Sequence, residues 1–426
     1  MNGARRSEGL SIFAAIAFAV GNMVGAGVFV LSGLMIDRVG PAVTLSYLIC
    51  GILVIFSGLS YAALASIFPE DGGGFLYAER MLGRYLGFMA GWSMYISEIV
   101  VTSFVLLGLG IYLNLLIGID LDHRLGALTA IILLTILNLR GLSEAGKIEV
   151  ILVMAKVIIL TLLVVVGLIH INRSDFVPFM PHGQGAVVDG ITTVFFAYIG
   201  FQVVAMMGGE IKGASMNVPI ATLASIGIVA ALYIGVIQAL LSAKLPSYGS
   251  ESVFDAAVVL LGAFGGTIVA IAAVISTLSA ANANIIGASR VILEMASEGQ
   301  IPGRFARLTN GQPLNSVLLG SAIITVLIIY GSLSFIVNLT NVLVLVTMLL
   351  VNISALRLVR ETKSLPPEKS YFKIPLGIVF PALGVVSCLA MLATIDATTL
   401  ILGFAALVAG MAFYFVEDTG SVPILM

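Results

Sequence analysis

The stretch that decides this fold reads Gly21-Asn22-Met23-Val24-Gly25-Ala26-Gly27-Val28-Phe29, and it lies inside the first long apolar segment. Its three glycines each cost a helix on the order of 1 kcal/mol relative to alanine, so we expect the helix to open here. In lipid, an open backbone is tolerated only where protein buries it or where it lines a cavity. The N–H groups of Gly25, Ala26 and Gly27 would begin a second half-helix, whose positive end suits a carboxylate. The stretch therefore predicts one half of a small-molecule binding site.

The rest of the chain is strongly apolar. Of its 426 residues, 60% are hydrophobic and only 10% are charged, and the mean hydropathy is +1.14. This composition excludes an ordinary water-soluble domain and indicates an all-α polytopic membrane protein. A net charge of -2 without any basic run gives no reason to expect nucleic acid as a partner. The motifs G-x-x-x-x-G-K-[ST], H-E-x-x-H and G-x-S-x-G are absent, so we expect neither a cofactor, a metal ion nor an enzymatic activity.

Twelve segments are long enough to cross about 30 Å of hydrocarbon at roughly 1.5 Å per residue. They lie near residues 10–35, 41–67, 84–117, 125–140, 147–171, 188–209, 218–243, 256–297, 314–331, 333–357, 374–395 and 398–416. Because twelve is even, both termini are expected on the same side of the membrane.

The basic residues of the loops indicate the orientation, since Lys and Arg are enriched in cytoplasmic loops. Only four lie on the side away from the termini, namely Arg38, Arg124, Arg173 and Lys244. Fifteen lie on the side of the termini, among them Arg5, Arg6, Lys363 and Lys369. We therefore expect a multi-pass protein of the cytoplasmic membrane with both termini in the cytoplasm. The one basic residue left over, Lys156, falls inside a span.

A second interruption occurs in the sixth span, in Phe195-Phe196-Ala197-Tyr198-Ile199-Gly200-Phe201-Gln202. Spans 1 and 6 take corresponding places if the first ten spans form two repeats of five. Because five is odd, the second repeat would be inverted, and broken helices at matching positions of inverted halves indicate a midplane transport site. The alternative is that these glycines serve close helix packing.

Three groups of motifs carry a family resemblance over nearly the whole chain. They are Gly21 to Phe29, Phe195 to Gln202 with Gly209-Glu210-Ile211-Lys212 and Asn217-Val218-Pro219-Ile220-Ala221, and Gly287-Ala288-Ser289-Arg290 with Ala296-Ser297-Glu298-Gly299-Gln300-Ile301-Pro302 and Phe305-Ala306. The loop from Pro69 to Tyr77 carries the same resemblance. The sequence resembles the amino acid, polyamine and organocation transporter superfamily, which implies a LeuT-type fold. The expected units are a first five-span repeat over 1–171, an inverted repeat over 172–360, and spans 11 and 12 over 361–426.

The chain departs from that family after span 6. Family members commonly carry an Asn-Pro pair and an arginine there, whereas this chain reads Gly213-Ala214-Ser215-Met216. The gating contacts of that cytoplasmic loop therefore do not carry over from the resemblance.

The resemblance implies a set of substrate-binding residues. The substrate carboxylate is expected at the N–H groups of Gly25, Ala26 and Gly27, and Phe196 is expected to close over the substrate. The substrate side chain is expected near Gln202 and Asn284. The substrate amino group is expected at carbonyls near Met23, Phe196, Ala197 and Ile199.

Two ionisable residues, Lys156 and Glu98, lie well inside spans, where a charge is costly and marks a functional candidate. In sodium-independent relatives a lysine like Lys156 fills the place of a sodium ion, and the resemblance implies that its ammonium bridges the Gly21 carbonyl and Ser279. It either exchanges a proton during the cycle or is a permanent structural tie. Glu98 either attracts a cationic substrate, carries a proton or is a hydrogen-bonded packing residue.

These features together predict a secondary active transporter of an amino acid or related amine that works by alternating access. Coupling to protons and independence of sodium are expected, because Lys156 would occupy the sodium place. Two alternatives are an exchanger that uses a counter-substrate and a membrane receptor that binds an amino acid without moving it. Spans 11 and 12 are expected at the periphery or in a dimer contact, so the protein is a monomer or a homodimer in the lipid bilayer.

Overall fold

The computed structural model describes residues 9–140, 146–309, 312–361 and 372–420. The sequence-based placement of both termini rests partly on Arg5, Arg6, Lys363 and Lys369, which lie outside these residues. Within the described residues the chain is helical, and extended pairing is limited to isolated bridges between Leu10 and Ile211 and between Thr309 and Gln312.

Each of the twelve predicted segments coincides with one or more helices. The long helices are α1 (Ile12–Met23), α3 (Val43–Ile67), α5 (Arg84–Ile117), α6 (His123–Leu139), α7 (Gly146–His170), α8 (Gly183–Tyr198), α10 (Ala214–Ser242), α11 (Ser252–Ser297), α12 (Leu314–Tyr330), α13 (Leu333–Glu361), α14 (Val379–Ala393) and α15 (Ala397–Gly420). The short ones are the π-helix η1 (Gly27–Leu31), α2 (Ser32–Val39), η2 (Gly40–Ala42), α4 (Gly74–Leu82), η3 (Arg173–Phe176), α9 (Val203–Met206), η4 (Gly208–Glu210) and η5 (Gly303–Phe305).

Both predicted interruptions are confirmed. α1 ends at Met23 and the helix resumes at Gly27 as η1, which continues into α2. α8 ends at Tyr198 and α9 begins at Val203. The helical stretch after the first break is longer than predicted, because it runs through Val39 rather than ending near residue 35.

The length and composition of the helices fit a polytopic membrane protein. Among the described residues, eight helical stretches are long and apolar enough to cross a membrane, and three shorter apolar helices accompany them. The first of these stretches, Ile12–Ile67, contains α1, α2 and α3.

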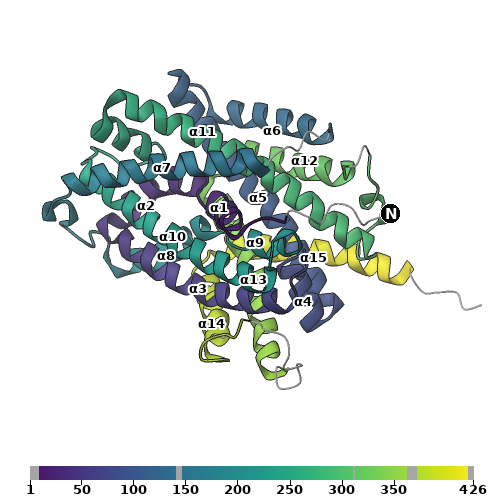
Figure 1. Ribbon diagram of the computed structural model, residues 1–426. Coiled ribbons are helices and arrows are strands. Elements are labelled where there is room, and N and C mark those ends of the chain that lie inside the picture. The colour runs from purple at the N-terminus through teal and green to yellow at the C-terminus, as the bar shows by residue number, and fades with distance from the viewer. Residues whose placement is uncertain (1–8, 141–145, 310–311, 362–371, 421–426) are drawn as a thin grey trace, which may run out of the picture.

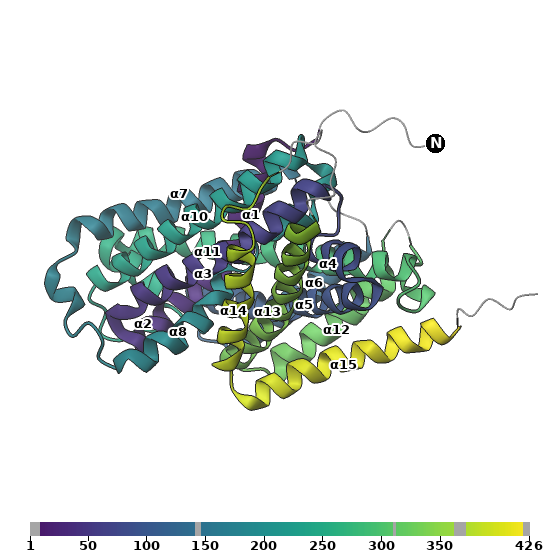
Figure 2. The ribbon, with the colours of Figure 1, turned by 90° about the horizontal axis from the view of Figure 1, so that it is seen from below.

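The helices form one packed body with α1 near its centre (Figure 1). α5 packs against α11, α13, α6 and α4, whereas α10 packs against α3, α7 and α1. α15 runs along one edge of the molecule (Figure 2). α11 bends at Gly262, whose φ of 78° lies in the left-handed region that glycine adopts readily. This arrangement brings the two interrupted helices together in the interior.

Candidate substrate-binding site

The two helix breaks lie against each other, and two glycines permit the contact. Gly200 has a φ of 124°, and a Cβ atom there would lie only 2.9 Å from the backbone nitrogen of Met23. A Cβ atom on Gly27 would lie 3.1 Å from Cα of Ala197. Any larger residue at Gly200 would therefore both strain the backbone and separate the breaks.

Tyr233 of α10 ties the two breaks together. Its hydroxyl group lies 2.7 Å from the carbonyl oxygen of Met23 and 2.8 Å from that of Ala197, and the side chain is fully buried. A phenol has one hydrogen to donate, so the two carbonyls share it. Sequence analysis missed this residue. Its only signal was a tyrosine in the middle of a largely apolar span.

The backbone of the first break is already hydrogen-bonded. The N–H group of Gly25 donates to the carbonyl oxygen of Met23 at 2.8 Å, and the same oxygen accepts from Tyr233. A carbonyl oxygen has two lone pairs, and at Met23 each of them faces one of these donors. Binding of a substrate amino group at Met23 stays a prediction, and it requires one of these two donors to move away.

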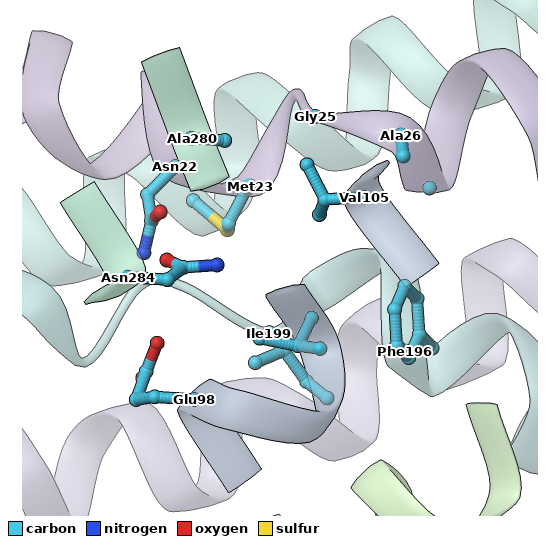
Figure 3. A pocket seen from close by; sticks show the side chains of 12 residues that line it. Asn22, Met23, Gly25, Ala26, Glu98, Val105, Phe196, Ile199, Ala280 and Asn284 are labelled. Carbon is cyan, nitrogen blue, oxygen red and sulfur yellow. The ribbon is translucent and has the colours of Figure 1, made fainter. Parts of the chain in front are cut away.

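The breaks open onto a cavity between α1, η1, α5, α8 and α11 (Figure 3). Its lining consists of Asn22, Met23, Gly25, Ala26, Gly27, Glu98, Val101, Val105, Phe196, Ile199, Ala280 and Asn284. The centre of a water molecule can reach about 30 Å³ of this cavity. This is room for roughly two or three water molecules and less than an amino acid needs. An amino acid can therefore enter only if part of the lining moves.

Most of the predicted substrate-binding residues meet at this cavity. Two of them, Ala197 and Gln202, are not part of the lining. The carbonyl of Ala197 accepts from Tyr233, and Oε1 of Gln202 accepts from the N–H group of Gly200 at 3.0 Å. Both residues shape the second break rather than face the cavity. Sequence analysis missed Asn22, a polar residue within the first break, and the apolar Val101, Val105 and Ala280.

One side of the cavity is polar and the other is apolar. Figure 3 shows Asn22, Asn284 and Glu98 on one side and Val105 and Phe196 on the other. The amide of Asn284 matches its surroundings when its nitrogen faces Oε2 of Glu98 and the carbonyl of Ala280, both at 3.3 Å. The polar side offers a carboxyl group and two amides, so it can bind a group with several N–H bonds, such as an ammonium group.

Phe196 closes the apolar side. Its ring meets that of Phe104 in an edge-to-face pair with centroids 4.6 Å apart, and only 4% of Phe196 is exposed. Nearby, the hydroxyl group of Tyr112 donates to the carbonyl of Phe29 at 2.8 Å. Phe104 lies outside the lining and holds Phe196 by ring packing, so a rotation of Phe196 would enlarge the cavity.

Lys156 of α7 lies outside the cavity lining but contacts the first broken helix. Its ammonium group donates to the carbonyl of Gly21 at 2.6 Å, as predicted, and to Oγ of Ser276 at 3.0 Å. The Ser276 hydroxyl in turn donates to the carbonyl of Val24 at 2.9 Å, within the break. Ser276 was missed, although it lies one turn before Ser279 on α11. A contact of Lys156 with Ser279 stays a prediction.

Gly21 lets α7 approach closely enough for this contact. A Cβ atom on Gly21 would lie 2.2 Å from Cγ2 of Val153, which precedes Lys156 by one turn on α7. The glycine is therefore required by the close approach of two helices, and it lies within α1, before the break.

The loop motifs gather at one end of the molecule. The carboxylate of Asp71 accepts from the N–H group of Gly209 at 2.9 Å, and Nε2 of Gln300 donates to Oε1 of Glu79 at 2.9 Å. Burial raises the pKa of Glu79, and the neighbouring charge of Glu298 raises it further. These contacts join the loop after α3, the segment after α9 and the end of α11 into one layer.

Comparison with known proteins identifies the family. The family model described as amino acid permease matches residues 10–416. The chain is 26% identical over 430 residues to the methylthioribose transporter of Bacillus subtilis (strain 168), covering 95% of this chain and 92% of the relative. It is 26% identical over 439 residues to the branched-chain amino acid permease BcaP of the same organism, with the same coverage. It is 31% identical over 328 residues to the inner membrane transport protein YbaT of Escherichia coli (strain K12), covering 75% of each chain.

The relatives are transporters rather than enzymes, and the helices are those of a multi-pass membrane protein. With a family match over nearly its full length, the chain belongs to the amino acid permease family.

Proposed function

We propose that this protein is a secondary active transporter that moves an amino acid across the cytoplasmic membrane by alternating access. The observation that carries the proposal is the cavity at two broken helices that lie side by side, lined by Glu98 and Asn284. Broken helices of this kind present backbone groups and helix ends to a charged solute near the middle of the membrane.

The cavity can accommodate both ends of an amino acid if it expands. Of the three N–H groups expected to meet the substrate carboxylate, that of Gly25 is bonded to the Met23 carbonyl. The carboxylate is therefore placed at Ala26, the N-cap of η1, and Gly27, its first residue. The amino group is placed toward the carbonyls of the breaks, and the side chain toward Asn284 and Glu98. Phe196 rotates to admit the substrate and then closes over it.

The proposed topology is twelve spans of the LeuT type, with repeats over 1–171 and 172–360 and two further spans over 361–426. Eight long apolar stretches, of which Ile12–Ile67 is long enough for two spans, and three shorter apolar helices support this number. The mobile part would consist of α1, α2, α3, α8, α9 and α10. It would rock against α5, α6, α11 and α12, with α14 and α15 peripheral or at a dimer contact. Both termini would be cytoplasmic.

We propose that transport is coupled to protons and does not need sodium. Lys156 is 3% exposed, and its ammonium group holds the Gly21 carbonyl and, through Ser276, the Val24 carbonyl. A cation fixed there leaves no need for a bound sodium ion to join α1 to α11. If Lys156 releases its proton, this tie weakens and the first broken helix is free to move.

Uptake into vesicles that contain the purified protein tests the proposal. The substrates to compare are branched-chain, other neutral and cationic amino acids, together with methylthioribose. An inward proton gradient, an inward sodium gradient and internal unlabelled substrate are imposed separately. We expect saturable uptake that responds to the proton gradient, ignores sodium and is lost in Lys156→Ala.

A matched control is Lys244→Ala, because Lys244 is 59% exposed and pairs with Asp175 outside the site. It should retain uptake. Uptake driven only by internal substrate would replace proton coupling with exchange, and saturable binding without uptake would replace the transporter with a receptor. Sodium dependence would refute the role given to Lys156.

A further inference from the structure

A second, smaller cavity lies behind Glu98, between α5, α11 and α12. Its lining consists of Tyr95, Glu98, Ile99, Thr102, Ile285, Ala288, Ser316, Val317, Gly320 and Ile324. Glu98 is the one residue that belongs to the linings of both this cavity and the substrate cavity. Glu98 therefore stands between two spaces, and only one of them has been assigned a role.

Two hydroxyl groups of this second cavity have no hydrogen-bond partner among the described residues. They are Oη of Tyr95 and Oγ of Ser316, whose residues are 0% and 1% exposed. An unsatisfied buried polar group costs about 1 to 3 kcal/mol, so two on one small cavity point to a missing partner. Tyr95 Oη also lies 3.9 Å from the place that a Cβ atom on Gly320 would take, which sets it at the α12 wall.

The cavity has the size and polarity of a site for one water molecule. The centre of a water molecule can reach about 10 Å³ of it. A buried water needs about 10 to 15 Å³ by this measure and two to four polar partners. Tyr95, Ser316 and Glu98 supply three partners, whereas the other walls are mainly aliphatic. An organic ligand is too large for the space.

We propose that a single buried water molecule binds in this second cavity and forms a hydrogen bond to Glu98 on the side away from the substrate cavity. The Tyr95 hydroxyl donates to the water, and the water donates to the Glu98 carboxyl group and to Oγ of Ser316, which uses both of its hydrogens. The Oε2 atom of Glu98 stays directed at Asn284 on the substrate side. Tyr95 and Ser316 are thus positioning residues that act on the substrate site through the water and Glu98.

Only the effect of this water on uptake rests on the proposed function, because its presence can be observed directly. The test is a structure of the full chain in lipid nanodiscs, at a resolution where ordered waters in the core are visible. We expect a water feature between Tyr95, Ser316 and Glu98. A map that shows other buried waters but leaves this cavity empty would overturn the proposal.

Gly320→Ala displaces the water without disturbing the helices. The new methyl group would lie 3.4 Å from Cδ1 of Ile99, so it fits and occupies part of the cavity. The matched control is Gly227→Ala on α10, where a Cβ atom meets nothing within 4 Å. The water feature should disappear from Gly320→Ala and persist in Gly227→Ala. Its persistence in both would contradict the assigned place.

Infrared spectroscopy can distinguish a positioning role of Tyr95 and Ser316 from a merely structural one, because only the positioning role would shift the carboxyl band of Glu98. The Glu98 carboxyl band is assigned by its loss in Glu98→Gln. It should shift in Ser316→Ala and Tyr95→Phe and keep its wild-type position in Ser354→Ala, whose hydroxyl donates to the Leu350 carbonyl at 2.8 Å. An unchanged band in both cavity variants would refute the link to Glu98.

In uptake assays, losing one hydrogen bond of about 1 kcal/mol should raise KM roughly fivefold in Ser316→Ala and leave kcat within about twofold. An unchanged KM would show that the water does not position Glu98 for the substrate. If the wild-type protein moves no substrate, the proposed function fails, but the map and the infrared band still decide whether the water is there.

Discussion

The replacement of Gly21 by alanine tests how the first broken helix is held. Gly21 lies in the last turn of α1, against Val153 of α7. A Cβ atom there would lie 2.2 Å from Cγ2 of Val153, whereas two carbon atoms normally stay at about 3.5 Å or more. The two helices must therefore separate by roughly 1 Å, or Val153 must change its rotamer.

The expected magnitude follows from this overlap. Overpacking of a filled interior costs about 1 to 3 kcal/mol, and replacing glycine by alanine in a helix returns at most about 1 kcal/mol. A separation of about 1 Å would also lengthen the contact between Lys156 and the Gly21 carbonyl from 2.6 Å to beyond a normal hydrogen bond. We therefore expect Gly21→Ala to destabilise the fold modestly and to abolish uptake.

The assay is equilibrium unfolding in mixed micelles, combined with uptake into vesicles. Val153→Ala removes the methyl groups that cause the overlap, so the double variant should be more stable than the sum of the two single effects by at least about 1 kcal/mol. It should also recover part of the uptake. Gly227→Ala serves as the control, because it makes the same change where no atom lies within 4 Å.

The reasoning would be refuted if the two substitutions had additive effects, since the overlap joins these two side chains. It would also be refuted if Gly21→Ala transported like the wild type, because the contact between Lys156 and the first broken helix would then not matter for transport.

Three further predictions rest on other contacts. Tyr233→Phe removes the hydroxyl that contacts both breaks, so unfolding in micelles should show a loss of about 1 to 3 kcal/mol and uptake should fall; wild-type uptake would contradict the tie. Phe196→Ala removes the ring that packs on Phe104, so uptake should drop severely at normal expression, and intact transport would mean that the ring closes nothing. Glu79 has its pKa raised by burial and then by Glu298, so the native state holds this proton more tightly than the unfolded state. Stability should therefore fall as the pH rises above the ordinary glutamate pKa of 4.5, and Glu79→Gln should flatten this part of a thermal unfolding profile, whereas an unchanged profile would remove Glu79 as the cause.

Much of the fold could be predicted because composition and segment length act locally. An apolar run of sufficient length must form a helix in lipid, since every backbone group has to be satisfied within the segment. The two breaks were predictable for the same reason: Gly25, Gly27 and Gly200 weaken a helix wherever it lies. The contact between Lys156 and Gly21 came instead from the family resemblance, and the structure places these two groups in contact.

The site residues that were missed depend on the relative rotation and distance of whole helices. Whether Tyr233 reaches both breaks, or Ser276 joins Lys156, is fixed by which face of α10 or α11 turns inward. Nothing in the spacing along one segment determines that face when all faces are apolar. The same reason explains why Gln202 was expected in the cavity, although its side chain bonds to the N–H group of Gly200.

The sequence by itself thus determined that this is a helical membrane protein with interruptions at Gly21–Phe29 and Phe195–Gln202, because helix formation in lipid is a local property. Only the tertiary structure decided that the interruptions touch, that Tyr233 joins them and that Glu98 stands between two cavities. These are contacts between segments far apart in the chain, and they depend on the packing of large and small side chains across helix interfaces.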